Sequence, residues 1–169
     1  MHLWLSGFGN KPKIGISWKG GSRTTNNKYR RTRLNHEWLE VLKEQECSFV
    51  SLQYHEDAIK EIEMLRQEHG IHIIHDQEIM NDYDLTAALV TNLDCIFSVP
   101  QSVVHLAGAL GIPTFQLTPK QAMWQMGPYG KDMPWYGCVK NIWQESPGEW
   151  ESVFKKVKEI IWSSLHQNT

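Results

Sequence analysis

A basic segment that contains two glycines follows the first apolar run of the sequence. The run KIGISW is followed by KGGSRTTNNKYRR, residues 19–31. Gly20 and Gly21 would let the backbone approach a ligand closely, because they have no Cβ atom. Lys19 and Arg23 could neutralise phosphate oxygens through charge-assisted hydrogen bonds. The segment matches neither GxGxxG nor a Walker A loop, so a flexible loop without a ligand is an equal alternative.

A second candidate for anion binding is PQSVVHLAGALG, residues 100–111. Gln101, Ser102 and Val103 fall at the N-terminus of a predicted helix, where free N–H groups and the helix dipole favour an anion. A serine cap, followed by tight packing of small residues, is the structural alternative. His105 could contact a ligand, but a histidine on an apolar helix face is more often a core residue.

The remaining polar candidates indicate ligand contact rather than catalysis. Gln53 follows the apolar run SFVSL and could read a base or a ribose, or be an exposed residue without a ligand. Asp82 and Asp84 precede a predicted helix, where capping is their ordinary role. No Ser-His-Asp, Cys-His or paired-carboxylate arrangement is evident, so the sequence identifies no catalytic nucleophile or general base.

Charge is distributed unevenly along the 169 residues. Residues 1–36 contain eight basic residues and no acidic residue, whereas the remainder carries a net charge of −10. A basic segment on an otherwise acidic chain indicates a local anion site. The acidic remainder would repel a long polyanion, so we expect no nucleic acid partner.

The composition also argues against other classes of protein. No window of about 18 consecutive apolar residues occurs, so we expect no membrane span. The N-terminus lacks a secretory pattern, and an odd number of widely spaced cysteines favours a reducing, cytoplasmic compartment. His69, His72 and His75 are three residues apart at the start of a predicted strand, which places neighbours on opposite faces, so we expect no metal site there.

Apolar runs alternate with helical patterns along the chain. Strands are predicted over residues 13–18, 48–52, 71–74, 94–99 and 113–117. Helices are predicted over residues 35–46, 56–69, 84–93, 102–110 and about 148–165. Because the strands are continuous apolar runs, the pattern predicts an α/β fold, with a doubly wound, mostly parallel Rossmann-like sheet of about five strands and helices on both faces.

Particular residues mark the predicted helix ends. Asn35 and Asp84 can cap helix N-termini, and Gly70 and Gly111 can end helices. SPGE, residues 146–149, matches a capping box with Pro at the first helical position.

Residues 118–145 form the longest stretch without a predicted element. It is too long for an ordinary loop, so it is either functional or packed by its own aromatic residues. We expect packing for Trp124, Trp135, Trp143 and Tyr136.

The two anion-binding candidates are expected to meet. In open α/β sheets, ligands bind beyond the carboxyl ends of the strands. Both segments follow strands expected near the sheet centre, so Lys19, Gly20 and Arg23 should converge with Ser102 on one diphosphate.

The order of the motifs resembles one family. KIGISWKGG, FVSLQ, DLTAALVTNLDCIFSV, HLAGALGIPTF, MPWY and GEW follow one another from about residue 13 to the end. This pattern resembles the C-terminal, donor-binding half of the heptosyltransferase-like glycosyltransferases (glycosyltransferase family 9), especially the kind that follows tetratricopeptide repeats. The resemblance implies that residues 13–169 form one half of a GT-B fold and that residues 1–12 are a connector.

The resemblance also implies a ligand and a partner. The domain would bind a nucleotide-diphosphate sugar as donor substrate, without a metal ion or other cofactor. An N-terminal acceptor-binding or repeat domain, which this sequence does not include, would supply the group that activates the acceptor.

Three functions remain open from the sequence. The first is the donor-binding half of a glycosyltransferase, in which Lys19, Arg23 and the helix N-terminus near Ser102 stabilise the leaving diphosphate. The second is a non-catalytic module that binds a nucleotide or phosphosugar, or serves as a scaffold. Pro100, Gln101 and Gln125, which depart from the family pattern, favour this second function. The third is another GT-B enzyme, such as a nucleotide-sugar epimerase.

Overall fold

Six strands form one parallel sheet at the centre of the molecule. The computed structural model describes residues 7–20, 32–34, 36–44, 46–121 and 123–166. From edge to edge the strands are β3 (Ile73–Ile74), β2 (Ser48–Ser51), β1 (Lys13–Ser17), β4 (Cys95–Ser98), β5 (Thr114–Thr118) and β6 (Val139–Trp143). All neighbouring strands are paired in parallel, so the predicted α/β fold is confirmed.

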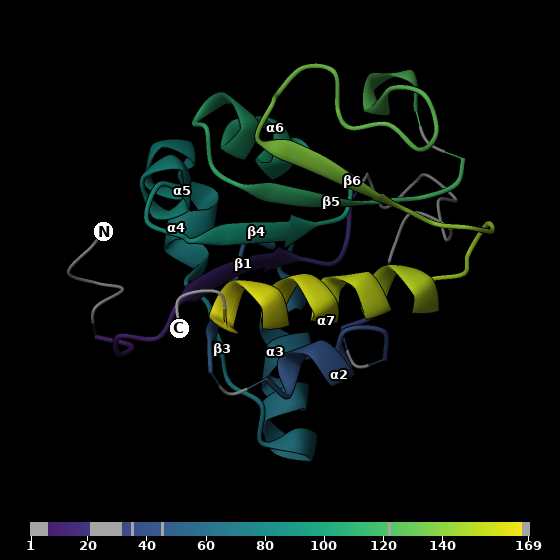
Figure 1. The fold of residues 1–169 in the computed structure, drawn as a ribbon. Helices are drawn as coiled ribbons and strands as arrows, with labels where there is room; N and C mark the ends of the chain where they lie inside the picture. Colours follow the sequence, from purple (N-terminus) through teal and green to yellow (C-terminus); the bar gives the residue numbers. More distant parts are fainter. Residues whose placement is uncertain (1–6, 21–31, 35, 45, 122, 167–169) are drawn as a thin grey trace.

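Helices cover both faces of the sheet (Figure 1). They are α2 (Leu39–Leu42), α3 (Asp57–His69), α4 (Gln77–Asn81), α5 (Tyr83–Val90), α6 (Ser102–Ala109) and α7 (Glu151–His166), with the short 3-10 helix η2 (Trp124–Met126). Core contacts place α2, α3 and α7 on one face and α4, α5 and α6 on the other. The described residues contain no helix that is both long and apolar enough to cross a membrane.

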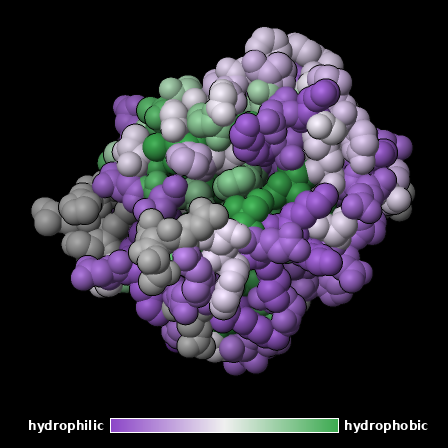
Figure 2. Space-filling view, viewed as in Figure 1, coloured by the Kyte–Doolittle hydropathy of each residue, from purple (hydrophilic) through white to green (hydrophobic). Residues whose placement is uncertain are grey.

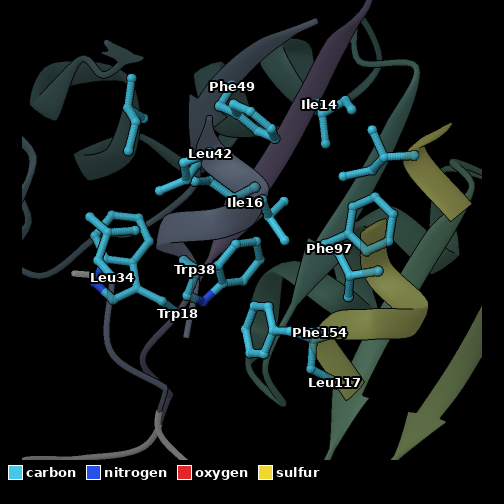
Figure 3. Close-up of a cluster of buried hydrophobic side chains, with 14 of the residues drawn as sticks. Ile14, Ile16, Trp18, Leu34, Trp38, Leu42, Phe49, Phe97, Leu117 and Phe154 are labelled. Carbon is cyan, nitrogen blue, oxygen red and sulfur yellow. The ribbon is translucent and has the colours of Figure 1, made fainter. Parts of the chain in front are cut away.

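The larger core cluster lies under α2, α3 and α7 (Figure 3). Trp38 and Phe154 meet edge to face with ring centroids 5.0 Å apart, and this contact joins the α2 segment to α7. Phe97 of β4 stacks on Phe115 of β5 at 4.9 Å. Large aromatic side chains contribute much of the apolar area that a core buries, so these contacts help to hold α2 against α7 and β4 against β5.

The opposite face needs a glycine in β1. A Cβ atom on Gly15 would lie 2.8 Å from the Cδ1 atoms of both Leu52 and Leu93. The absence of a side chain therefore lets these leucines pack directly over the central strand.

The predicted helix ends are right in part. Gly70 and Gly111 have left-handed φ angles of 65° and 75° at helix C-termini, as predicted. Asp82, rather than Asp84, caps α5, because its carboxylate accepts hydrogen bonds from the N–H groups of Asp84 and Leu85 at 2.9 and 3.0 Å.

The region before β2 also differs from the prediction. The helix α2 has four residues, whereas one over residues 35–46 was expected. Asn35, its predicted cap, lies outside the described residues. A further short helix, α4, was not predicted; Asp76 caps it by accepting hydrogen bonds from Glu78 and Ile79 N–H.

The capping box predicted at residues 146–149 is wrong. Gly148 has a φ of 81°, and α7 begins later, at Glu151. The carboxylate of Glu149 accepts hydrogen bonds from the N–H and the hydroxyl of Ser152, at 3.0 and 2.9 Å. Glu149 therefore performs the capping that the prediction assigned to Ser146.

The expectation that residues 118–145 are irregular is also wrong, because this stretch contains η2 and the edge strand β6. Lys140 of β6 is exposed and pairs with Asp132 at 2.7 Å, so the strand lacks the continuous apolar pattern that marked the others. Figure 2 shows apolar surface between β6 and α7, where a groove of about 420 Å³ includes Ile142 and Ile160 in its lining.

Candidate functional site

The strand order places a reversal of the winding between β1 and β4, and we call the end of the sheet at this point the crevice. From the centre of the sheet, β1, β2 and β3 follow one another toward one edge, and β4, β5 and β6 follow one another toward the other edge. The direction of winding therefore reverses between β1 and β4. The two strands end level, since Ser17 is paired with Ser98. In doubly wound sheets, ligands bind beyond the carboxyl ends of the strands at this reversal point.

The first loop and the start of α6 meet at this crevice. Gly20 is buried, and a Cβ atom there would lie only 2.3 Å from the carbonyl oxygen of Pro100. The amide nitrogen of Gln101 donates hydrogen bonds to the hydroxyls of Ser17 and Ser98, the latter at 3.3 Å. The structure thus brings Gly20 together with the residues that begin α6. Gly21 and Arg23, the other predicted members of this loop, lie outside the described residues.

The N-terminus of α6 is not closed by a side-chain cap. Gln101 occupies the N-cap position in an extended conformation and makes no capping hydrogen bond. Ser102 is the first helical residue and is exposed, so the alternative of a simple serine cap is wrong. Val103 is buried and packs in the core beneath α6. The first turn of α6 therefore presents its positive end at the crevice.

Gln53 holds the chain that leads into the crevice. Its side chain is fully buried, so the alternative of an exposed polar residue is wrong. Its amide oxygen accepts hydrogen bonds from the Ser17 hydroxyl and from the N–H groups of Trp18 and Lys19, at 2.9, 3.2 and 3.0 Å. Its amide nitrogen donates to the carbonyl of Lys19 at 2.9 Å. Gln53 thus fixes the backbone at the end of β1, and its predicted contact with a base or ribose stays a prediction.

Lys19 is paired with an acidic residue that no sequence motif marks. Its ammonium group contacts the carboxylate of Glu61 on α3, and the indole N–H of Trp18 donates to the same carboxylate at 2.6 Å. Both charged side chains are about one-quarter exposed. An anion at the crevice would therefore compete with Glu61 for Lys19.

His105 lies beside an aromatic residue of the long segment before β6. Its half-buried ring meets Tyr136 edge to face, with ring centroids 5.8 Å apart. Tyr136 also lies over Gly108, where a Cβ atom would be 2.4 Å from the tyrosine ring. The small residues of α6 thus make room for Tyr136.

Buried amides form a polar network that the sequence analysis missed. Gln116 of β5 is fully buried and donates hydrogen bonds to Asn141 at 2.9 Å and Thr118 at 3.2 Å. Asn141 in turn donates to the carbonyls of Met126 and Lys131, at 3.0 and 3.1 Å. A glutamine inside the apolar run PTFQL was the available signal, because an amide buried in a strand requires hydrogen-bond partners.

The aromatic residues of the segment 118–145 divide into two groups. Trp143 is buried and Tyr136 packs against the core, as predicted. Trp124 and Trp135 are 76% and 55% exposed, so the expectation that they pack inside is wrong. Their rings meet edge to face with centroids 6.2 Å apart.

The sheet order, the crevice and the open start of α6 together define one Rossmann-like half of a GT-B fold. The chain superposes on Escherichia coli ADP-heptose heptosyltransferase II with a TM-score of 0.65 and 16% identity, covering 99% of this chain and 51% of that one. UDP-GlcNAc 2-epimerase from Neisseria meningitidis, solved with UDP-GlcNAc bound, gives a TM-score of 0.56 and 18% identity, covering 96% of this chain and 40% of that one. These likenesses establish the fold.

A curated relative is protein FlbA of Caulobacter vibrioides. It is 31% identical over 159 residues, which are 93% of this chain and 26% of FlbA. No protein-family model matches the chain. The chain therefore spans about a quarter of its relative and about half of the heptosyltransferase.

Proposed function

We propose that this chain is the donor-binding domain of a metal-independent GT-B glycosyltransferase and binds the diphosphate of a nucleotide sugar between β1 and β4. The observation that carries the proposal is the contact of Gly20 with Pro100, which brings the first loop to the open N-terminus of α6. A loop that packs without side chains against a helix N-terminus leaves backbone N–H groups available to phosphate oxygens.

The proposed mechanism is electrostatic. When a glycosyl bond to the diphosphate breaks, negative charge develops on the leaving oxygen, and the positive end of α6 would stabilise that charge. Lys19 would leave Glu61 and pair with the diphosphate, joined by Arg23 of the same loop. Gln53 would contribute indirectly, by holding the backbone of Lys19 in place.

The finer assignment belongs to the same proposal. The order of the motifs supports membership of glycosyltransferase family 9, of the kind that follows tetratricopeptide repeats. An N-terminal acceptor-binding or repeat domain would supply the acceptor and its activating base, in keeping with the half-length coverage of the heptosyltransferase. We place the protein in the cytoplasm, which free thiols at Cys47, Cys95 and Cys138 support.

A non-catalytic nucleotide-binding module is the second candidate. The side chain of Gln101 is occupied by the hydroxyls of Ser17 and Ser98, at a position where the family pattern has a different residue. Such a module would bind nucleotide sugars without transferring the sugar, so an assay of sugar transfer in the presence of an acceptor-binding domain separates the two candidates. The epimerase function has less support, because an epimerase would need carboxylates in the crevice. Asp76 and Asp82 instead serve as helix caps.

The experiment is a comparison of nucleotides with nucleosides by titration calorimetry. Lys19→Met should weaken ADP or UDP about tenfold or more, because one charge-assisted hydrogen bond is lost, and leave adenosine or uridine unchanged. Lys140→Met is the matched control, since Lys140 is an exposed lysine of the edge strand β6 and is likewise paired with a carboxylate, that of Asp132. Equal losses for nucleotide and nucleoside, or failure of the wild-type chain to bind any nucleotide, would contradict the proposal.

A further inference from the structure

Two exposed indoles stand together on the segment that follows β5. Trp124 opens η2, and Trp135 lies beyond it, with the two ring planes inclined at 84°. The indole N–H of Trp135 donates to the carbonyl of Gln125 at 2.8 Å, which fixes the second ring relative to η2. Large aromatic side chains that remain exposed in a group mark binding surfaces more often than isolated ones do.

Two side chains of β6 hold the segment that carries this aromatic pair. Asn141 donates hydrogen bonds to the carbonyls of Met126 and Lys131, and Trp143 donates to the carbonyl of Lys131 at 3.0 Å. Both donors belong to β6, and Gln116 of β5 supports Asn141. The segment from the end of η2 to Lys131 is thus tied to β6, which limits the conformational entropy that binding of a ligand would remove.

The aromatic pair is close to the open end of α6. Met126 of η2 belongs to the same buried cluster as Val104, which is in the first turn of α6. In Figure 1, η2 lies at the end of the sheet toward which the strands point, which is the end where β1 and β4 finish. A ring attached to a phosphate at Ser102 would therefore lie at the same end of the sheet as η2.

We propose that Trp124 and Trp135 form a stacking surface for the sugar ring of the nucleotide sugar. This inference rests on the proposed function, because the diphosphate at α6 is what brings the sugar to the indoles. One face of a pyranose carries C–H groups that are apolar and weakly positive, and it complements the negative face of an indole. The hydroxyls at the rim of the sugar remain free for water or polar side chains.

The test compares nucleotide sugars with their parent nucleotides. The probes are UDP-GlcNAc against UDP and ADP-heptose against ADP, titrated into the whole chain. Trp124→Ala should weaken the nucleotide sugar that binds the wild type by about three- to tenfold and leave the parent nucleotide unchanged. Trp124→Phe should restore most of the loss, because a phenyl ring still offers a stacking face.

A matched control exists on another surface. Trp162 of α7 is 58% exposed and stacks on His166 at 3.9 Å, so Trp162→Ala removes an exposed indole elsewhere and should change neither affinity. A urea denaturation midpoint measured for each variant shows whether the variant is still folded, and so separates a loss of stability from a loss of contact with the sugar. In NMR spectra, the indole N–H signal of Trp124 should move with the nucleotide sugar and stay in place with the nucleotide.

The possible outcomes distinguish this inference from the function on which it rests. Equal weakening of nucleotide and nucleotide sugar by Trp124→Ala would mean that the indole stacks on the base, and would overturn the assignment to the sugar. Unchanged affinity for both would overturn any role of Trp124 in binding. If the wild-type chain binds none of the four probes, the proposed function itself is overturned.

Discussion

Replacement of Gly20 by alanine tests the geometry at the centre of the crevice. The new methyl group would lie 2.3 Å from the carbonyl oxygen of Pro100, well inside van der Waals contact. The neighbour is backbone at the start of α6, so the collision cannot be relieved by turning a side chain. Overpacking of this kind costs about 1–3 kcal/mol, and we expect the upper half of that range.

The predicted loss can be measured by urea denaturation. With an m-value of about 2 kcal/mol per molar urea, a loss of about 2–3 kcal/mol lowers the midpoint by about 1–1.5 M. Gly137→Ala is the matched control, because a Cβ at Gly137 would meet no atom within 4 Å. That substitution should leave the midpoint unchanged or raise it slightly, since alanine restricts the unfolded chain.

The same variant reports on binding. Because the loop and α6 must separate to admit the methyl group, Gly20→Ala should also weaken ADP or UDP at temperatures where the variant remains folded. A midpoint equal to that of the wild type would refute the packing argument. A lowered midpoint with full nucleotide affinity would refute the placement of the diphosphate in this crevice.

Two further predictions concern the helix cap and the thiols. Glu149→Ala should lower the free energy of unfolding by about 1 kcal/mol, whereas Ser146→Ala should leave the denaturation midpoint unchanged; the reverse order would restore the capping box. Burial raises the pKa of the Cys47 and Cys95 thiols to about 12 each, so thiol reagents at pH 8 should label them only when the chain unfolds. Since the folded state holds these protons more tightly, both thiols stabilise the fold below their ordinary pKa near 9, and that contribution is lost as the pH rises toward 12. Denaturation midpoints across that alkaline range should fall less steeply for Cys95→Ala than for the wild type.

The central part of the sheet could be predicted because its strands are buried on both faces. A continuous apolar run such as DCIFSV is typical of a parallel strand that helices cover on both faces. The predicted helices between such runs supply the crossover connections of a parallel sheet. The edge strand β6 escaped prediction, since Lys140 faces solvent and Asn141 joins a polar network. The cap of α5 was misplaced by two residues because either Asp82 or Asp84 could serve, and only the extended backbone at Asp82 decides between them.

The candidate site was predictable in its topology and not in its contacts. Parallel strands that are neighbours end at the same edge, so the approach of Gly20 to the start of α6 followed from the expected order. The pairing of Lys19 with Glu61 joins residues 42 positions apart, and no local pattern marks it. Likewise, the hydrogen bonds of Gln53 to the end of β1 depend on how two strands pack side by side.

The exposed lysine of β6 has a consequence for the behaviour of the protein at high concentration. A strand at the edge of a sheet presents unpaired backbone groups that can join the sheet of a second molecule and begin aggregation. Lys140 lies on that edge and is paired with the exposed carboxylate of Asp132. Edge-to-edge association would have to remove this charge from water, so Lys140 protects the sheet from self-association. The same residue interrupts the apolar pattern by which β6 could have been predicted from the sequence.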